Sequence, residues 1–175
     1  MDREIVDPLR ELSTYLLAHP ELAFKEYLAH DACIKFFHAH CQDWKITSKA
    51  YGMETAWEAV YTQGTGGRRI VFCSEYDALP DIGHACIISL DNFGNKVIGG
   101  HNLICVGGIA AGLGAVKRLK RNPNQAGTVV ILGTPAEEGS SSTSRKVRSY
   151  QTNLKAVEEN TSYSIEEHLS IQLQV

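Results

Sequence analysis

The sequence predicts a layered α/β domain, and the order of its hydrophobic patterns carries that prediction. Two segments with helical spacing come first, short segments rich in β-branched and aromatic residues follow, and a Gly- and Ala-rich helical segment precedes an apolar strand. Elements in this order usually pack as helices on a sheet. The continuous apolar run GTVVILG at 127–133 is typical of a strand buried on both faces, which favours a mostly parallel sheet.

The predicted helices are defined by apolar spacing and by prolines. Residues 4–18 carry leucines at intervals of three and four residues, and Pro20 ends that helix. A second helix is predicted from Lys25 to His40, and a third, which Asn122-Pro123 stops, from Asn102 to Arg121. The buried face of the second helix is predicted to carry Tyr27, Leu28, Ile34 and Phe37.

The predicted strands are short segments rich in β-branched and aromatic residues. They are Trp44 to Thr47, Thr55 to Thr62, Arg69 to Ser74 and Gly127 to Gly133. After Glu138 the chain becomes polar and rich in Ser, Gln and Glu. We therefore expect residues 1–139 to belong to one domain and residues 140–175 to form a divergent, poorly ordered tail, because few apolar side chains offset the entropy of ordering.

Composition and charge exclude several classes of protein. With 43% hydrophobic and 21% charged residues the chain has the balance of a soluble domain, and its net charge of -3 argues against a nucleic-acid partner. The start, MDREIVDPLR, is not a signal peptide, and no stretch approaches the 18 apolar residues of a membrane span. The five cysteines are irregularly spaced, so we expect reduced thiols and a cytoplasmic protein.

Three stretches at predicted strand ends or helix starts hold the residues suited to chemistry. They are residues 75–80 (EYDALP), residues 83–86 (GHAC) with 100–102 (GHN), and residues 133–138 (GTPAEE). Together they supply carboxylate, thiolate and imidazole groups, which bind zinc or manganese. The pair Glu137-Glu138 follows an apolar strand, where two negative charges are costly unless a cation neutralises one. Taken alone, such a pair is more often a solvated loop or helix start.

The other candidate residues have structural interpretations. We expect His19, Pro20 and Glu21 to shape the boundary between the first two helices. His84 is either a loop-shaping residue or a neighbour of a metal ligand. The residues expected on the surface are His30, His38 and His40. Those expected in or near the core are Cys33, Cys41, Cys73 and Cys105. The glycines expected to allow close helix packing, rather than to bind a dinucleotide, are Gly107, Gly108, Gly112 and Gly114.

The order of the motifs is more specific than any one of them. HPEL followed by Glu26, then EYDALP, GHAC, GHNLI and GTPAEEG, covers roughly residues 8–139 and resembles metallopeptidase family twenty, which contains aminoacylases, dipeptidases and other amidohydrolases. The chain is most similar to the branch of peptidase-domain-containing dipeptidases and aminobenzoyl-glutamate hydrolases. This resemblance implies an incomplete, zinc-peptidase-like, three-layer αβα domain with a mostly parallel sheet. It also implies hydrolysis of dipeptides or N-acyl amino acids with zinc or manganese.

The same resemblance implies roles for five residues. Cys86, His101 and Glu138 would be metal ligands, and Glu137 would be the general base that takes a proton from the attacking water. Asp77 would orient a ligand or the site.

The chain departs from the family pattern in two places. Residues 87–99 split the motif GHACGHN, so that Cys86 and His101 stand fifteen residues apart instead of two. Apolar arms around residues 91–95 suggest a hairpin that returns the chain. Secondly, we expect the chain to lack the family's later ligands and its dimerisation domain. The alternative function is therefore a non-catalytic partial domain without independent activity, from a splice variant, a frameshifted reading or a mispredicted gene.

Overall fold

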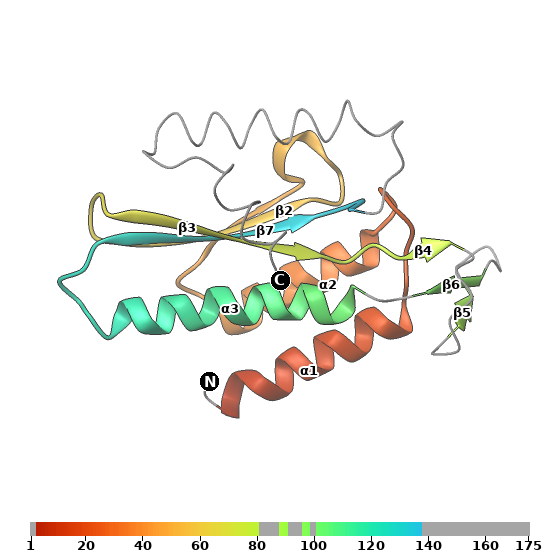
Figure 1. The fold of residues 1–175 in the computed structure, drawn as a ribbon, viewed down its shortest axis with the longest axis horizontal. Helices are drawn as coiled ribbons and strands as arrows, with labels where there is room; N and C mark the ends of the chain where they lie inside the picture. Colours follow the sequence, from red (N-terminus) through yellow and green to blue (C-terminus); the bar gives the residue numbers. More distant parts are fainter. Residues whose placement is uncertain (1–2, 81–87, 91–95, 99–100, 138–175) are drawn as a thin grey trace, which may run out of the picture. The chain divides into compact units, whose positions relative to one another are not determined.

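The structure is a computed structural model that describes residues 3–80, 88–90, 96–98 and 101–137. The elements, in chain order (Figure 1), are α1 (Arg3–Ala18), α2 (Tyr27–His40), β1 (Lys45–Ser48), the 3-10 turn η1 (Ala50–Gly52), β2 (Trp57–Gln63), β3 (Arg68–Glu75), β4 (Leu79–Pro80), β5 (Ile88–Leu90), β6 (Lys96–Ile98), α3 (Asn102–Lys120) and β7 (Gly127–Thr134). The predicted α/β class and the predicted helices and long strands are confirmed, with ends that shift by at most two residues.

The main sheet has the strand order β1-β2-β7-β3 and is mixed. β7 pairs in parallel with β3 but antiparallel with β2, which in turn pairs antiparallel with β1. The prediction of a mostly parallel sheet was therefore wrong for the described strands. Helix α3 connects β3 to β7, and such a crossover gives a parallel pair. β7 then lies between two strands that are neighbours in sequence, and its other edge pairs antiparallel with β2.

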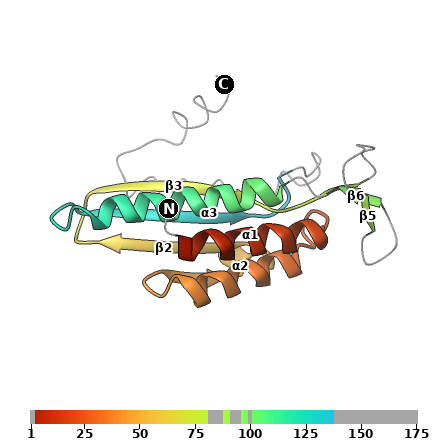
Figure 2. The same cartoon turned by 90° about the horizontal axis from the view of Figure 1, so that it is seen from below.

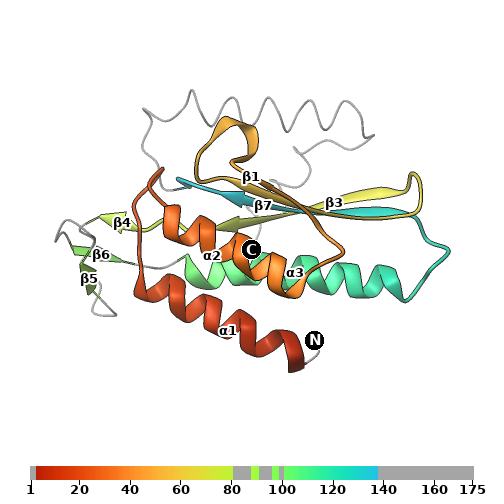
Figure 3. The same cartoon turned by 180° about the vertical axis from the view of Figure 1, so that it is seen from behind.

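All three helices lie on one face of this sheet, as Figures 2 and 3 show. α3 packs against β3 and β7, α2 packs against β1 and β2, and α1 packs against the other two helices. No helix in the described part of the chain covers the opposite face. The second helical layer of the expected αβα arrangement is thus not seen among these residues.

The buried face of α2 differs from the predicted one. Tyr27 and Leu28 are 52% and 37% exposed, whereas the small residues Ala29 and Cys33 are buried. Cys33 faces α3, and its Sγ lies 3.7 Å from the Cys105 Sγ of that helix. The buried positions of this face are Ala29, His30, Cys33, Phe36 and Phe37.

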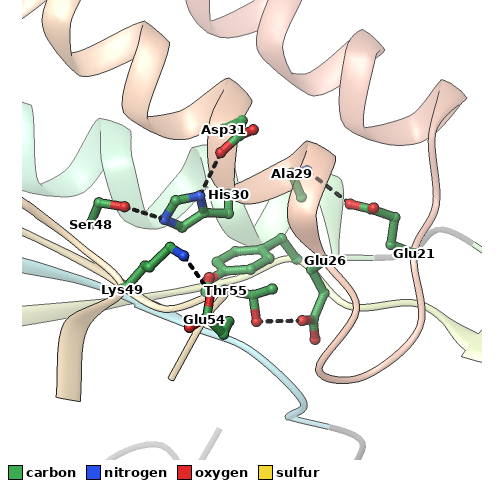
Figure 4. A network of polar contacts seen from close by, with 10 residues as sticks. Glu21, Glu26, Ala29, His30, Asp31, Ser48, Lys49, Glu54 and Thr55 are labelled. Atoms are coloured by element: carbon green, nitrogen blue, oxygen red, sulfur yellow. Dashed lines mark hydrogen bonds and ion pairs between the residues drawn. The ribbon is translucent and has the colours of Figure 1, made fainter. Parts of the chain in front are cut away.

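His30 was wrongly predicted to be a surface residue, since it is 5% exposed. Its Nδ1 lies 2.8 Å from Asp31 Oδ1 and its Nε2 lies 3.0 Å from Ser48 Oγ (Figure 4). Both ring nitrogens therefore have polar partners, which is what burial of an imidazole requires. His38 and His40 are exposed, as predicted.

Helix α3 packs closely on the sheet through two of its glycines. A Cβ at Gly108 would lie 2.2 Å from the Cys73 carbonyl oxygen, and one at Gly112 would lie 2.4 Å from an Ile131 methyl. The packing interpretation is confirmed at these positions but not at Gly107 and Gly114, where a Cβ would meet nothing within 4 Å. Contrary to the sequence estimate, α3 has the length and mean hydropathy, 1.3, of a possible membrane span. Its contacts with β3 and β7 make it the central helix of this domain.

Three of the four cysteines in the described segments are buried as predicted, but Cys73 is exposed. Cys73 lies on β3, an edge strand of the sheet. In the described residues, no strand pairs with the outer edge of β3. Burial raises the pKa of the Cys41 thiol to about 11, although Lys120 acts in the opposite direction.

This pKa gives a testable prediction for Cys41. At pH 8 its thiolate fraction is expected to be more than about 100-fold below that of an ordinary cysteine with a pKa near 8.5. Iodoacetamide should therefore modify Cys41 at least that much more slowly than it modifies the cysteine of an unstructured peptide, as measured by peptide mass spectrometry. Modification at the rate of the peptide cysteine would show that the side chain is not held in this environment.

Candidate active site

The candidate site lies where β3, β7 and α3 meet. β3 and β7 are parallel, and Glu75 at the end of β3 pairs with Thr134 at the end of β7. Residues that follow the two strands therefore emerge at one edge of the sheet. His101 is the residue immediately before α3, and this end of α3 lies at the same edge (Figure 1).

Buried contacts hold the start of α3 against the two strands. The hydroxyl of Ser74, which is fully buried, donates a hydrogen bond to the Cys105 carbonyl at 3.0 Å. The Thr134 hydroxyl donates to the Ser74 carbonyl at 3.2 Å. On the outer side of the helix, Asn102 Nδ2 donates to Ser13 Oγ of α1 at 2.9 Å. The position of His101 relative to both strands is thus set by backbone and hydroxyl groups.

Three acidic or imidazole side chains converge at this edge. Each of Glu75, His101 and Glu137 offers one potential metal-ligand atom, a carboxylate oxygen or a ring nitrogen. These three atoms all lie within 4.8 Å of one another. Two carboxylates and an imidazole are donors that zinc and manganese accept. The donor set present in the described residues therefore fits a divalent cation.

Glu75 was missed as a site residue. It is the first residue of the EYDALP motif and the last residue of β3. A carboxylate directly after an apolar strand was the signal used for Glu137, and the same signal applied to Glu75 would have found it.

Asp77 lies against His101, below the surface. Asp77 Oδ1 is 2.9 Å from His101 Nδ1, and the Asp77 side chain is fully buried while that of His101 is 13% exposed. This hydrogen bond raises the pKa of His101, and burial acts in the opposite direction. An imidazole held through Nδ1 by a carboxylate has a fixed ring orientation, and its Nε2 is left to coordinate a metal ion. Such a contact is what the predicted orienting role of Asp77 requires.

The remaining predicted site residues, Cys86 and Glu138, lie outside the described residues, as does His84. The inserted segment between Cys86 and His101 is described in part. The predicted hairpin is confirmed, because β5 and β6 pair antiparallel, with Ile88 opposite Ile98. β6 also pairs with β4, where Leu79 is opposite Ile98. The hairpin therefore returns the chain beside the segment that follows Asp77.

Two buried glutamates of the loop between α1 and α2 contact these site-bearing segments. Glu21 accepts a hydrogen bond at its carboxylate from the Ala29 amide at 2.9 Å, as suits an anion at a helix N-terminus. Its backbone carbonyl accepts one from the Ala78 amide at 2.8 Å. The structural role predicted for Glu21 is thus confirmed. Glu26 is fully buried and accepts a hydrogen bond from the Ala136 amide at 2.9 Å.

Comparison with known proteins gives matches to one group. The family model described as peptidase family M20/M25/M40 matches residues 71–171, a range that begins in β3 and includes the residues of the candidate site. The match runs past residue 139, where the resemblance by motifs ends. Residues 140–171 lie outside the described part of the chain, so their predicted lack of order stays a prediction.

Two curated relatives are both named Xaa-Arg dipeptidase. The mouse protein is 34% identical over 145 residues and the human protein is 36% identical over 148 residues. Each match covers 77% of this chain and 30% of the relative, so the chain spans less than a third of the length of these proteins.

A solved structure shows the same fold. It is a crystal structure from Bacillus subtilis, described as a dinuclear metal-binding peptidase from the M20 family. It superposes with a TM-score of 0.60 at 21% sequence identity, over 79% of this chain and 37% of the other.

Proposed function

Because this chain belongs to peptidase family M20/M25/M40, we propose that it is a metal-dependent hydrolase of the amide bond in dipeptides or N-acyl amino acids. The convergence of Glu75, His101 and Glu137 at one edge of the sheet carries this proposal. The names of the two curated relatives favour a dipeptide with a C-terminal arginine as the first substrate to test.

We assign the cation to His101 and Glu75, with Cys86 and Glu138 as the further ligands implied by the family motif. Zinc or manganese suits a set of carboxylate, imidazole and thiolate donors, and the Bacillus relative is described as binding two metals. A bound divalent cation would supply Lewis-acid chemistry, polarising the scissile carbonyl and making water a stronger nucleophile at neutral pH.

Glu137 and Asp77 have separate roles in this proposal. Glu137 is exposed and close to the ligand group, so it is able to take the proton from the attacking water and pass it to the leaving amine. Asp77, which is buried, holds the His101 ring through Nδ1 and does not contact the substrate. One carboxylate thus moves a proton, and the other fixes an orientation.

The proposal is tested by metal content and turnover measured on the same sample. The chain, purified with zinc or manganese, is expected to hold about one equivalent of metal or more and to release arginine from Xaa-Arg dipeptides. The variant His101→Ala should lose most of the metal, while Asp43→Asn, which alters an exposed ion pair with Lys120, should retain it. Less than about a tenth of an equivalent of metal, with no turnover, would favour the alternative of a non-catalytic partial domain.

Deletion of residues 87–99 tests whether Cys86 and His101 act together. The deletion joins Cys86 to Gly100 and restores the continuous motif, which removes the entropy of closing the hairpin. Metal occupancy and manganese affinity, measured by elemental analysis and calorimetry, are expected to rise, because Cys86 and His101 then stand two residues apart. As a control, replacing residues 91–95 by Asn-Gly shortens only the hairpin tip and should leave the affinity unchanged. An unchanged or lower metal occupancy in the deletion variant would count against Cys86 and His101 acting together.

A further inference from the structure

Glu26 has a carboxylate with an unusual number of buried donors. Its Oε1 accepts hydrogen bonds from the amides of Phe24 at 2.8 Å and Ala136 at 2.9 Å, and its Oε2 accepts one from the Thr55 hydroxyl at 2.8 Å. Figure 4 shows Glu26 and Thr55 pointing toward one another between the α2 end of the loop and the sheet. Glu26 is fully buried and Thr55 is 1% exposed. These three donors come from three separate parts of the chain.

The network continues from Thr55 to the other site-bearing segment. The Tyr76 hydroxyl donates a hydrogen bond to the Thr55 carbonyl at 2.5 Å, and Tyr76 is 5% exposed. Tyr76 stands between Glu75, in the ligand group, and Asp77, which holds His101. Through Thr55, Glu26 is therefore connected to the end of β3.

At its other end the network reaches the residue before Glu137. Ala136 has a φ of +60°, in the left-handed region that alanine rarely adopts and that costs about 1–2 kcal/mol. Its amide is buried and bonded to Glu26, so the surrounding structure holds it there. The backbone conformation at Ala136 sets the direction in which the chain presents Glu137.

We propose that Glu26 is a positioning residue that joins the end of β3, which carries Glu75 and is followed by Asp77, to the loop carrying Glu137. The inference rests on the proposed function in one respect. The connection serves to fix the spacing of the acidic groups around a cation. Glu26 does not contact the cation or the substrate. Groups that fix ligand geometry from behind usually change metal affinity by roughly 10- to 100-fold when removed.

A matched pair of variants separates positioning from simple stability. Glu26→Met keeps the length of the side chain but removes both acceptor oxygens and with them all three hydrogen bonds. Glu21→Met does the same to a buried glutamate of the same loop, whose carboxylate caps α2 at Ala29. Glu26→Gln is the conservative variant, because its amide oxygen is able to accept from both backbone amides and its NH2 group is able to donate to Thr55.

Two readouts are needed, and one of them does not require metal. The first is the ratio of two amide hydrogen-exchange rates, that of Ala136 divided by that of Ile131, measured by NMR on the full chain. Ile131 is a buried residue of β7. The second is Mn²⁺ affinity from calorimetry. In Glu26→Met the exchange ratio is expected to rise at least tenfold and Mn²⁺ affinity to fall roughly 10- to 100-fold. Glu21→Met should speed both amides equally and keep the affinity within about threefold, and Glu26→Gln should restore both readouts.

If Glu26→Met does not fold, Glu26→Asp serves in its place, since a carboxylate one methylene shorter cannot reach the same three donors. An unchanged exchange ratio in either folded variant overturns the positioning role. Absence of Mn²⁺ binding by the parent chain contradicts the proposed function instead, and the exchange ratio still decides whether Glu26 holds Ala136.

Discussion

Replacing Gly108 by alanine is expected to destabilise the domain by about 3 kcal/mol, although alanine is the better helix former. The added Cβ would lie 2.2 Å from the Cys73 carbonyl oxygen and 2.7 Å from Ser74 Oγ. Both contacts are on β3, and the closer one is backbone, which cannot rotate away as a side chain does. Helix and strand would have to separate along their whole contact. Urea unfolding monitored by circular dichroism measures the change.

Gly107 is the matched control, one residue earlier in the same helix. A Cβ there would meet nothing within 4 Å, so Gly107→Ala should stabilise the domain by about 0.5–1 kcal/mol through helix propensity alone. The two adjacent Gly→Ala substitutions are thus expected to change the free energy of unfolding in opposite directions. Equal effects at the two positions would contradict the close packing of α3 on β3.

Replacing Glu137 by glutamine is expected to lower the rate of dipeptide hydrolysis by roughly 10²- to 10⁴-fold, because the amide cannot take a proton from water. Metal content should change little, since the proposed ligands His101 and Glu75 are untouched. Turnover of an Xaa-Arg dipeptide and metal content by elemental analysis, measured on one preparation, give both quantities.

The comparison with Glu75→Gln makes this prediction specific. Glu75 is assigned as a ligand, so its variant should lose metal together with activity. Glu54→Gln, which removes an exposed partner of Lys49, should lose neither. If Glu137→Gln loses metal to the same extent as Glu75→Gln, then Glu137 is a ligand and the base is another group.

Local patterns were enough to place the helices and long strands, because apolar spacing and prolines act over a few residues. The position of β7 was not predictable in this way. Its apolar run reports burial on both faces, but it does not report whether the neighbour on each side runs parallel or antiparallel. The face of α2 was misjudged for a related reason. Tyr27 and Leu28 are large and apolar but exposed, whereas the buried face of α2 includes the small residues Ala29 and Cys33.

The candidate site was predicted only in part, for physical reasons. Motifs placed Asp77, His101 and Glu137 at strand and helix ends, and the structure brings these segments to one edge. The contact between Asp77 and His101 depends on the packing of α3 against β3, which a linear pattern does not contain. Glu26 was noted only as part of a motif, because its partners at Thr55 and Ala136 are 29 and 110 residues away in sequence.

The paired arms of β5 and β6 have a consequence for how such chains vary. Adding or removing one residue on each arm near the tip leaves Ile88 facing Ile98, because antiparallel pairing grows outward from its base. Length changes of this kind therefore do not alter the distance that the chain spans between the two halves of the split motif. Homologues with longer or shorter segments at this point are expected to tolerate them, and a search that demands the uninterrupted motif would overlook them.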